Sequence, residues 1–298
     1  MSFTSDVKNE LFSIEENDQS FISQIYGSLI FSRIFTLNES AVTTENKAYS
    51  QYLSEIIAVC GSFSQVDYKI RRKGTIYNIT IPEENERINL LSFFSHTGKE
   101  ISLRINNNFV KTENQTRAFL KGAFISCGAV SDPYKEYHLE FSVSHYLLAQ
   151  DLVLLISNAN DFEPMIIERN GRFVIYLKDS EKISDFLTYI GAFKSSMELM
   201  QAKMLKEVRN NVNRKNNFET ANIDKTVKAS FEQNRAIEKI INNKGYEAFG
   251  PSLIELAKLR LENPEMSLRE LSEILGISRS GVNHRLKKIM EMAEDIED

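Results

Sequence analysis

Apolar residues along the first two thirds of the chain switch between helical and strand spacing in an order that occurs twice. The first copy predicts a helix, a paired-strand region, a second helix and a hairpin, over residues 22–31, 34–44, 47–59 and 65–81. The second copy predicts the same order over residues 117–125, 130–143, 145–157 and 163–178. This repetition predicts two similar αββαββ halves, over residues 1–90 and 91–200.

Glycines mark matching points in the two copies. Gly27 matches Gly122, and the Lys-Gly pair at 73–74 matches the Asn-Gly pair at 170–171, at separations of about 95 and 97 residues. Each dipeptide is expected to make the turn of its hairpin, and Asn-Gly is typical of a type I′ turn. Two unrelated α+β segments that align by chance are the alternative to an internal duplication.

Residues 227–298 predict an all-α domain built around a helix-turn-helix. One helix follows Pro251 and ends before Asn263, which precedes a proline. Ser267 begins a short second helix through a capping box, and Gly276 allows the left-handed residue of a tight turn after it. Helix, glycine turn and helix in this order indicate a helix-turn-helix.

Ser278 caps the helix after the turn, whose inner face carries Val282, Leu286 and Ile289 at i, i+4 and i+7. The remaining positions near its start are polar or basic: Arg279, Ser280, Gly281, Asn283, His284, Arg285, Lys287 and Lys288. In a recognition helix, amide and imidazole groups read base edges and cations neutralise phosphates. We therefore expect double-stranded DNA as the partner. A helical bundle that makes protein contacts is the alternative.

Residues 201–226 are expected to form an exposed basic connector. Gln201 to Gly245 contains ten Lys/Arg against five Asp/Glu, and its early part has too few apolar positions to bury a helix face. Helical spacing returns at Val227, where the terminal domain is expected to begin. Arg214 and Lys215 are candidate contacts to the DNA backbone, and a merely solvated connector is the alternative.

The tip of the first hairpin is a second basic region. Arg71, Arg72 and Lys73 lie there, while Arg169 and Arg172 flank the second turn. These tips are candidate phosphate contacts. Ordinary solvated hairpin ends are the alternative.

The composition narrows the class of protein. With 298 residues, 42% hydrophobic and 26% charged, the chain is expected to be globular with a sizeable core. Two cysteines are too few for a disulfide framework, and the sequence opens without a charged-then-apolar leader. The most apolar stretch, residues 145–157, falls short of the ~20 residues of a membrane span. We expect a cytoplasmic, nucleoid-associated protein with no membrane partner.

Two glycine-containing segments, "FLKGAFISCG" and "IYGSLIFSR", resemble the paired helices of LAGLIDADG homing endonucleases. The resemblance implies that the two helices pack face to face with Gly27 and Gly122 at their contact, where a side chain would hold the backbones apart. The expected fold class is therefore α+β, a duplicated LAGLIDADG-like body followed by an all-α helix-turn-helix domain.

The same resemblance implies where metal-binding acids would lie. Those positions are Ser32, followed by Arg33 in place of the closing glycine, and Cys127, followed by Gly128. A hydroxyl and a thiol are poor ligands for the hard cations that hydrolyse phosphodiesters. We expect no catalytic residues, no metal and no other cofactor. The alternative is a metal-dependent endonuclease that recruits Asp132.

Four segments resemble the WhiA family of bacterial sporulation and cell-division regulators: "MSFTSDVKNEL", "GAFISCGAVSDPYKEYHLE", "NRKNNFETANIDKT" and "SRSGVNHRLKKI". The resemblance implies a transcription regulator without nuclease activity that binds promoter DNA chiefly through the helix-turn-helix. It leaves the larger body available for DNA or for another regulatory protein. Because a duplicated body can form a pseudo-dimer by itself, a monomer is compatible with the sequence, which does not reveal whether two copies bind DNA together.

Overall fold

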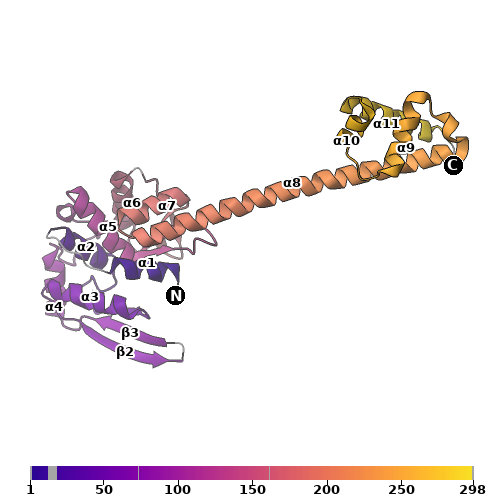
Figure 1. Cartoon of the computed structure of the whole chain (residues 1–298). Helices are drawn as coiled ribbons and strands as arrows, with labels where there is room; N and C mark the ends of the chain where they lie inside the picture. The colour runs from indigo at the N-terminus through magenta and orange to yellow at the C-terminus, as the bar shows by residue number, and fades with distance from the viewer. Residues whose placement is uncertain (1, 13–18, 73, 161, 297–298) are drawn as a thin grey trace. The chain divides into compact units, whose positions relative to one another are not determined.

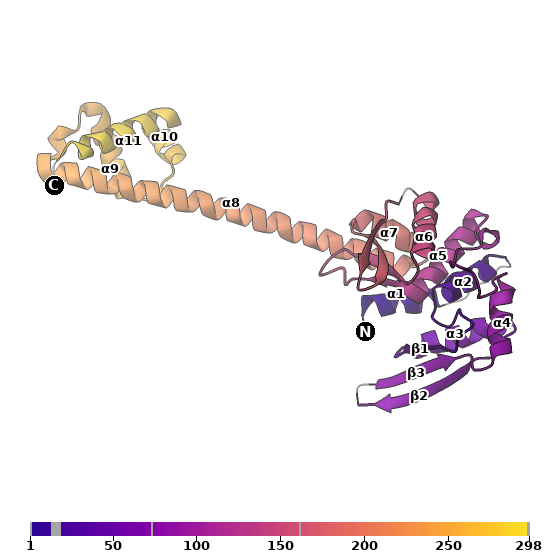
Figure 2. The same cartoon turned by 180° about the vertical axis from the view of Figure 1, so that it is seen from behind.

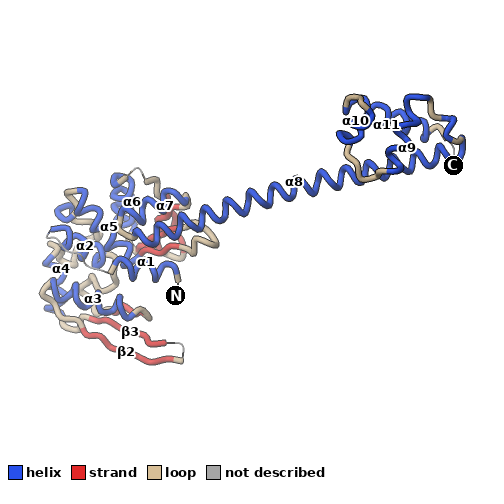
Figure 3. The backbone as a smooth tube through the Cα atoms, in the orientation of Figure 1, coloured by secondary structure: helices blue, strands red, loops and turns tan. Residues whose placement is uncertain are grey.

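The protein is described by a computed structural model that covers residues 2–12, 19–72, 74–160 and 162–296 (Figure 1). The chain divides into two compact units, Met1–Glu207 and Val208–Asp298. All described strands belong to the first unit, and the described residues of the second unit form only helices and loops (Figure 3). No described helix combines the length and hydrophobicity needed to cross a membrane.

The first half of unit 1 contains a three-stranded antiparallel sheet in the order β1-β3-β2, with α3 beside it (Figures 1 and 2). Its elements are α1 (Phe3–Leu11), α2 (Gln19–Ile30), β1 (Ala41–Thr44), α3 (Lys47–Val59), β2 (Gln65–Arg71), β3 (Gly74–Thr80) and α4 (Glu84–Phe93). The helix predicted over 47–59 is confirmed, and it begins there because the side chain of Asn46 accepts a hydrogen bond from the Tyr49 amide.

The second half contains a four-stranded antiparallel sheet in the order β4-β5-β7-β6. Its elements are η1 (Asn107–Phe109), α5 (Glu113–Cys127), β4 (Gly128–Val130), β5 (Leu139–Val143), α6 (Tyr146–Ala159), β6 (Met165–Arg169), β7 (Arg172–Leu177) and α7 (Ser180–Tyr189). Asn170 and Gly171 have φ of 53° and 69°, which confirms the predicted type I′ turn.

Three details of the body differ from the sequence prediction. The region 34–44 contains one described strand, β1, because Ile34 and Phe35 are buried in the core within a turn instead of pairing in a sheet. Gly74 pairs with Arg71 and therefore belongs to β3, as Arg172 pairs with Arg169 in the second hairpin. The predicted match of Gly74 to the turn residue Gly171 is therefore wrong by one position. Lys73, the other expected turn residue, lies outside the described residues.

The core of unit 1 is centred on α2 and α5, which pack with their backbones in contact. A Cβ added to Gly27 would lie 2.1 Å from the Phe119 carbonyl oxygen, and one added to Gly122 would lie 2.1 Å from that of Gln24. The Ser28 hydroxyl also donates a hydrogen bond of 3.3 Å to the Gly122 carbonyl. The predicted glycine contact is therefore confirmed, and no other residue fits at either position.

Unit 2 differs from prediction at its start. Its elements are the end of α8 (Phe193–Lys244), then η2 (Tyr246–Ala248), α9 (Pro251–Glu262), α10 (Leu268–Leu275) and α11 (Arg279–Glu294). Residues 207–225 are all exposed, as expected of a connector, but they belong to the single helix α8. Asparagine and β-branched residues are frequent in this stretch and it buries no face, so neither helix propensity nor an apolar stripe indicated that the helix continues.

Candidate nucleic-acid interface

The predicted recognition helix, α11, is held in place by its cap and by an apolar stripe. Ser278 accepts a hydrogen bond of 3.1 Å from the Gly281 amide, which begins the helix as predicted. Val282 and Leu286 are buried and pack with Leu271 of α10. The preceding turn is also as predicted, because Ser267 and Glu270 complete a capping box and Gly276 is left-handed with φ of 64°.

The residues predicted to contact DNA divide into two groups. Six are exposed on α11, and they are Arg279, Ser280, Asn283, His284, Lys287 and Lys288. Gly281 and Arg285 are partly buried. Nη1 of Arg285 donates a hydrogen bond of 3.1 Å to the Ser252 carbonyl, which joins α11 to the start of α9. A Cβ on Gly281 would lie 3.3 Å from the capping oxygen of Ser278, so glycine protects the cap.

A cavity of about 350 Å³ lies beside the start of α11, within unit 2. Its polar lining comes from four helices and consists of Lys225, Thr226, Gln233, Arg260, Ser267, Arg269, Arg279 and Asn283. Four of these residues are basic, and none of the described lining residues is acidic. The cavity therefore attracts anions next to the face that is expected to meet DNA.

Arg260 is one of the residues of this cavity that the sequence analysis did not identify. Its side chain is 2% exposed, and Nη1 donates a hydrogen bond of 2.6 Å to the Met266 carbonyl, while Nε has no partner in the part of the chain that the structure describes. Burial lowers the pKa of the guanidinium. Leu253, Leu256 and Arg260 follow one another at helical spacing on the buried face of α9. A cation within this apolar stripe was the available signal.

The other basic candidates do not share this setting. Arg214 and Lys215 are exposed on α8, and Arg71 and Arg72 are exposed at the first hairpin. In the second hairpin, Arg169 lies 3.3 Å from the Glu140 carboxylate. Arg214 and Lys215 belong to unit 2 but do not line the cavity beside α11.

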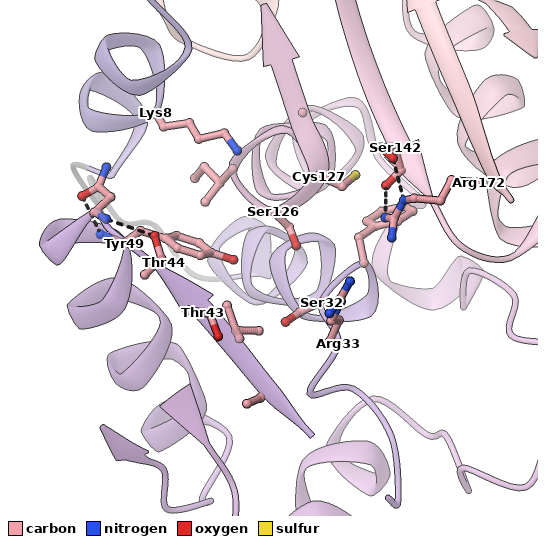
Figure 4. A pocket seen from close by; sticks show the side chains of 16 residues that line it. Lys8, Ser32, Arg33, Thr43, Thr44, Tyr49, Ser126, Cys127, Ser142 and Arg172 are labelled. Carbon is pink, nitrogen blue, oxygen red and sulfur yellow. Dashed lines mark hydrogen bonds between the residues drawn. The ribbon is translucent and has the colours of Figure 1, made fainter. Parts of the chain in front are cut away.

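The ends of α2 and α5 meet at a second cavity, of about 560 Å³ (Figure 4). Ser32 and Cys127, the positions where the nuclease resemblance implies acids, both line it. Asp132 does not line it, and its carboxylate accepts a hydrogen bond of 2.9 Å from the Tyr134 amide. Among the described residues, no three His, Cys, Asp or Glu side chains form a cluster that could hold a metal ion.

Packing around the ends of α2 and α5 determines the properties of Ser32, Cys127 and Gly128. Burial raises the pKa of Cys127 to about 12, although Lys8 and Arg172 act in the opposite direction, so the group is a neutral thiol near pH 7. Gly128 follows because a Cβ there would lie 2.4 Å from the Phe124 ring. The hydroxyl oxygen of Ser32 is buried and has no hydrogen-bond partner among the described residues.

The fold and the two sites define the class of this protein: a LAGLIDADG-like body joined to a helix-turn-helix domain. Models of the WhiA LAGLIDADG-like domain and the WhiA C-terminal HTH domain match residues 116–209 and 212–293. The chain belongs to the WhiA family.

Relatives match over nearly the whole chain. The sequence is 35% identical to the probable cell division protein WhiA of Clostridium tetani, over 99% of this chain and 98% of that protein. It is 37% identical to the protein of the same description from Clostridium beijerinckii, over 99% of both chains. The solved structure of full-length DUF199/WhiA from Thermatoga maritima covers 100% of both chains with 25% identity and a TM-score of 0.59.

Proposed function

We propose that this protein is a sequence-specific transcription regulator that binds promoter DNA through α11 and controls genes of cell division and sporulation. The observation that carries the proposal is the exposed polar and basic start of α11 beside a cavity with four cations. Side chains on such a face reach base edges, while neighbouring cations neutralise phosphates. The description of the relatives as probable cell division proteins supports the choice of target genes.

We further propose that the body has no nuclease activity and serves in DNA or protein contacts. Ser32 and the neutral thiol of Cys127 offer no carboxylate to a divalent cation. The cations that line the same cavity repel Mg²⁺ further.

Genome-wide mapping of the DNA bound by the full chain tests the proposal. We expect recurrent sites upstream of genes, with one shared sequence motif and loss of occupancy in an Asn283→Ala/His284→Ala variant. A fragment that begins at Tyr246 is a poor substitute, because Ile237 and Ile240 of α8 are buried in the core of unit 2. Uniform occupancy without a motif, or occupancy unchanged in the variant, would contradict the proposal.

A further inference from the structure

The cavity at the ends of α2 and α5 has a charge opposite to that of a metal site. Three of its lining residues are basic, namely Lys8 of α1, Arg33 after α2 and Arg172 of β7, and none of the described lining residues is acidic. The other polar lining groups include the hydroxyls of Ser32 and Ser126. Positive groups and hydroxyl donors together suit an anion.

Lys8 reaches the cavity from a partly buried position. Figure 4 shows Lys8 on one side of Ser126 and Cys127, with Arg172 on the other. No ion pair of Lys8 with a described carboxylate is present, and burial lowers the pKa of its ammonium group. An anion in the cavity would supply the missing opposite charge.

Arg172 is oriented before any ligand binds. Its Nε donates a hydrogen bond of 2.7 Å to the Ser142 hydroxyl, and its Nη2 donates one of 2.7 Å to the Ser142 carbonyl. Both acceptors lie on the neighbouring strand β5, so Nη1 remains as a fixed donor. Arg33 is exposed, and its side chain makes no hydrogen bond or ion pair with the described residues.

We propose that this cavity binds a phosphoryl group, held by Lys8, Arg33 and Arg172 where the nuclease resemblance implies metal-binding acids. Its volume of about 560 Å³ falls within the ~300–1,000 Å³ usual for small-ligand sites. The phosphoryl group belongs either to a free phosphate compound or to the DNA backbone. The second source rests on the proposed function.

The first arm of the test titrates the full chain with inorganic pyrophosphate by calorimetry at low ionic strength. We expect the chain to bind pyrophosphate. Arg33→Gln and Lys8→Gln should each weaken this binding at least about fivefold, which is the size of effect expected for the loss of one charge-assisted hydrogen bond at a partly solvent-exposed site. Lys99→Gln is the matched control, because Lys99 is exposed and does not line the cavity. Thermal melting checks folding, and Arg33→Gln should melt as the unsubstituted chain does.

The second arm measures affinity for a preferred DNA duplex over a range of salt concentrations. If the phosphoryl group comes from DNA, Arg33→Gln lowers the slope of log affinity against log salt by about one, and Lys99→Gln leaves it unchanged. Pyrophosphate binding that is absent or indifferent to Arg33 and Lys8, together with an unchanged slope, overturns the proposal. A chain that binds no DNA contradicts the proposed function instead, while the pyrophosphate arm still tests the cavity.

Discussion

At the scale of single residues, Gly27 and Gly122 determine how closely α2 and α5 approach. The atoms that a Cβ would meet are the backbone carbonyl oxygens of Gln24 and Phe119, and the faces of both helices at this contact are buried. Backbone atoms cannot rotate away as a flexible side chain would, so a methyl group must push the helices apart. The strain would spread through the core that both halves of unit 1 share.

Gly122→Ala should therefore destabilise unit 1 by about 3 kcal/mol, the upper part of the usual range for overpacking. Urea unfolding followed by circular dichroism measures the loss. Gly250→Ala is the control, because no atom lies within 4 Å of a Cβ added there, and it should cost at most about 1 kcal/mol. Equal midpoints for the two variants would show that the helices separate without cost.

Substitution of Arg260 should affect the stability of the fold and the affinity for DNA to different extents. A buried guanidinium without a carboxylate partner is unfavourable to folding, but its removal also leaves the Met266 carbonyl without its hydrogen bond. We expect Arg260→Met to change the free energy of unfolding by less than about 1 kcal/mol, because these effects oppose each other.

The same substitution should weaken binding to all DNA sequences about tenfold, since it removes one cation from the cavity beside α11. Fluorescence anisotropy with a preferred and a scrambled duplex measures both affinities. Arg269→Met also removes a cation of the cavity, but one whose charge is already paired with the exposed Glu273 carboxylate at 3.1 Å, so it should have a smaller effect. A large loss of stability with unchanged DNA affinity would make Arg260 a purely structural residue.

At the scale of elements, the proposed function assigns base-reading and phosphate-binding roles to different positions of α11. Asn283→Ala should reduce discrimination between preferred and scrambled duplexes by about 1–3 kcal/mol, whereas Lys287→Ala should weaken both duplexes equally. Both residues are exposed, so neither substitution should affect folding. Competition binding with the two duplexes measures the difference. If Asn283→Ala and His284→Ala both leave discrimination intact, another face of α11 reads the DNA.

Elements with a buried face and a local cap could be predicted from the sequence. The short helix α10 is an example, because Ser267, Glu270 and Gly276 mark its ends and Leu271 its buried face. The middle of α8 has no such signals, since its residues are exposed and include many asparagines, which are poor helix formers. Its continuity therefore could not be deduced from apolar spacing.

The helix α1 shows a different limit. Its residues Phe3, Val7 and Leu11 are buried at helical spacing, and Thr4 exchanges hydrogen bonds of 2.7 and 2.9 Å with the backbone of Val130. Spacing could have revealed the helix, but not its attachment to the second half. That contact joins residues 126 positions apart, and it brings Lys8 to the degenerate helix ends.

At the scale of the whole molecule, the net charge does not indicate either of the two basic cavities. The chain carries a formal charge of −5, yet the lining of each cavity contains basic residues and no described acidic one. Neither cluster is continuous in sequence, because each gathers residues from several elements. The sequence could predict the positions of the missing acids, Ser32 and Cys127, but the cations around them became apparent only in the fold.

This charge determines what restoring the acids should do. In a Ser32→Asp/Cys127→Asp variant, two new carboxylates would face Lys8, Arg33 and Arg172, so they would pair with cations already present before they could hold Mg²⁺. We expect neither the unsubstituted chain nor this variant to nick supercoiled plasmid with magnesium or manganese. Gel electrophoresis measures the cleavage, and thermal melting confirms that the variant is folded. Metal-dependent nicking by the unsubstituted chain that Asp132→Asn abolishes would make the body an active endonuclease with a relocated acid.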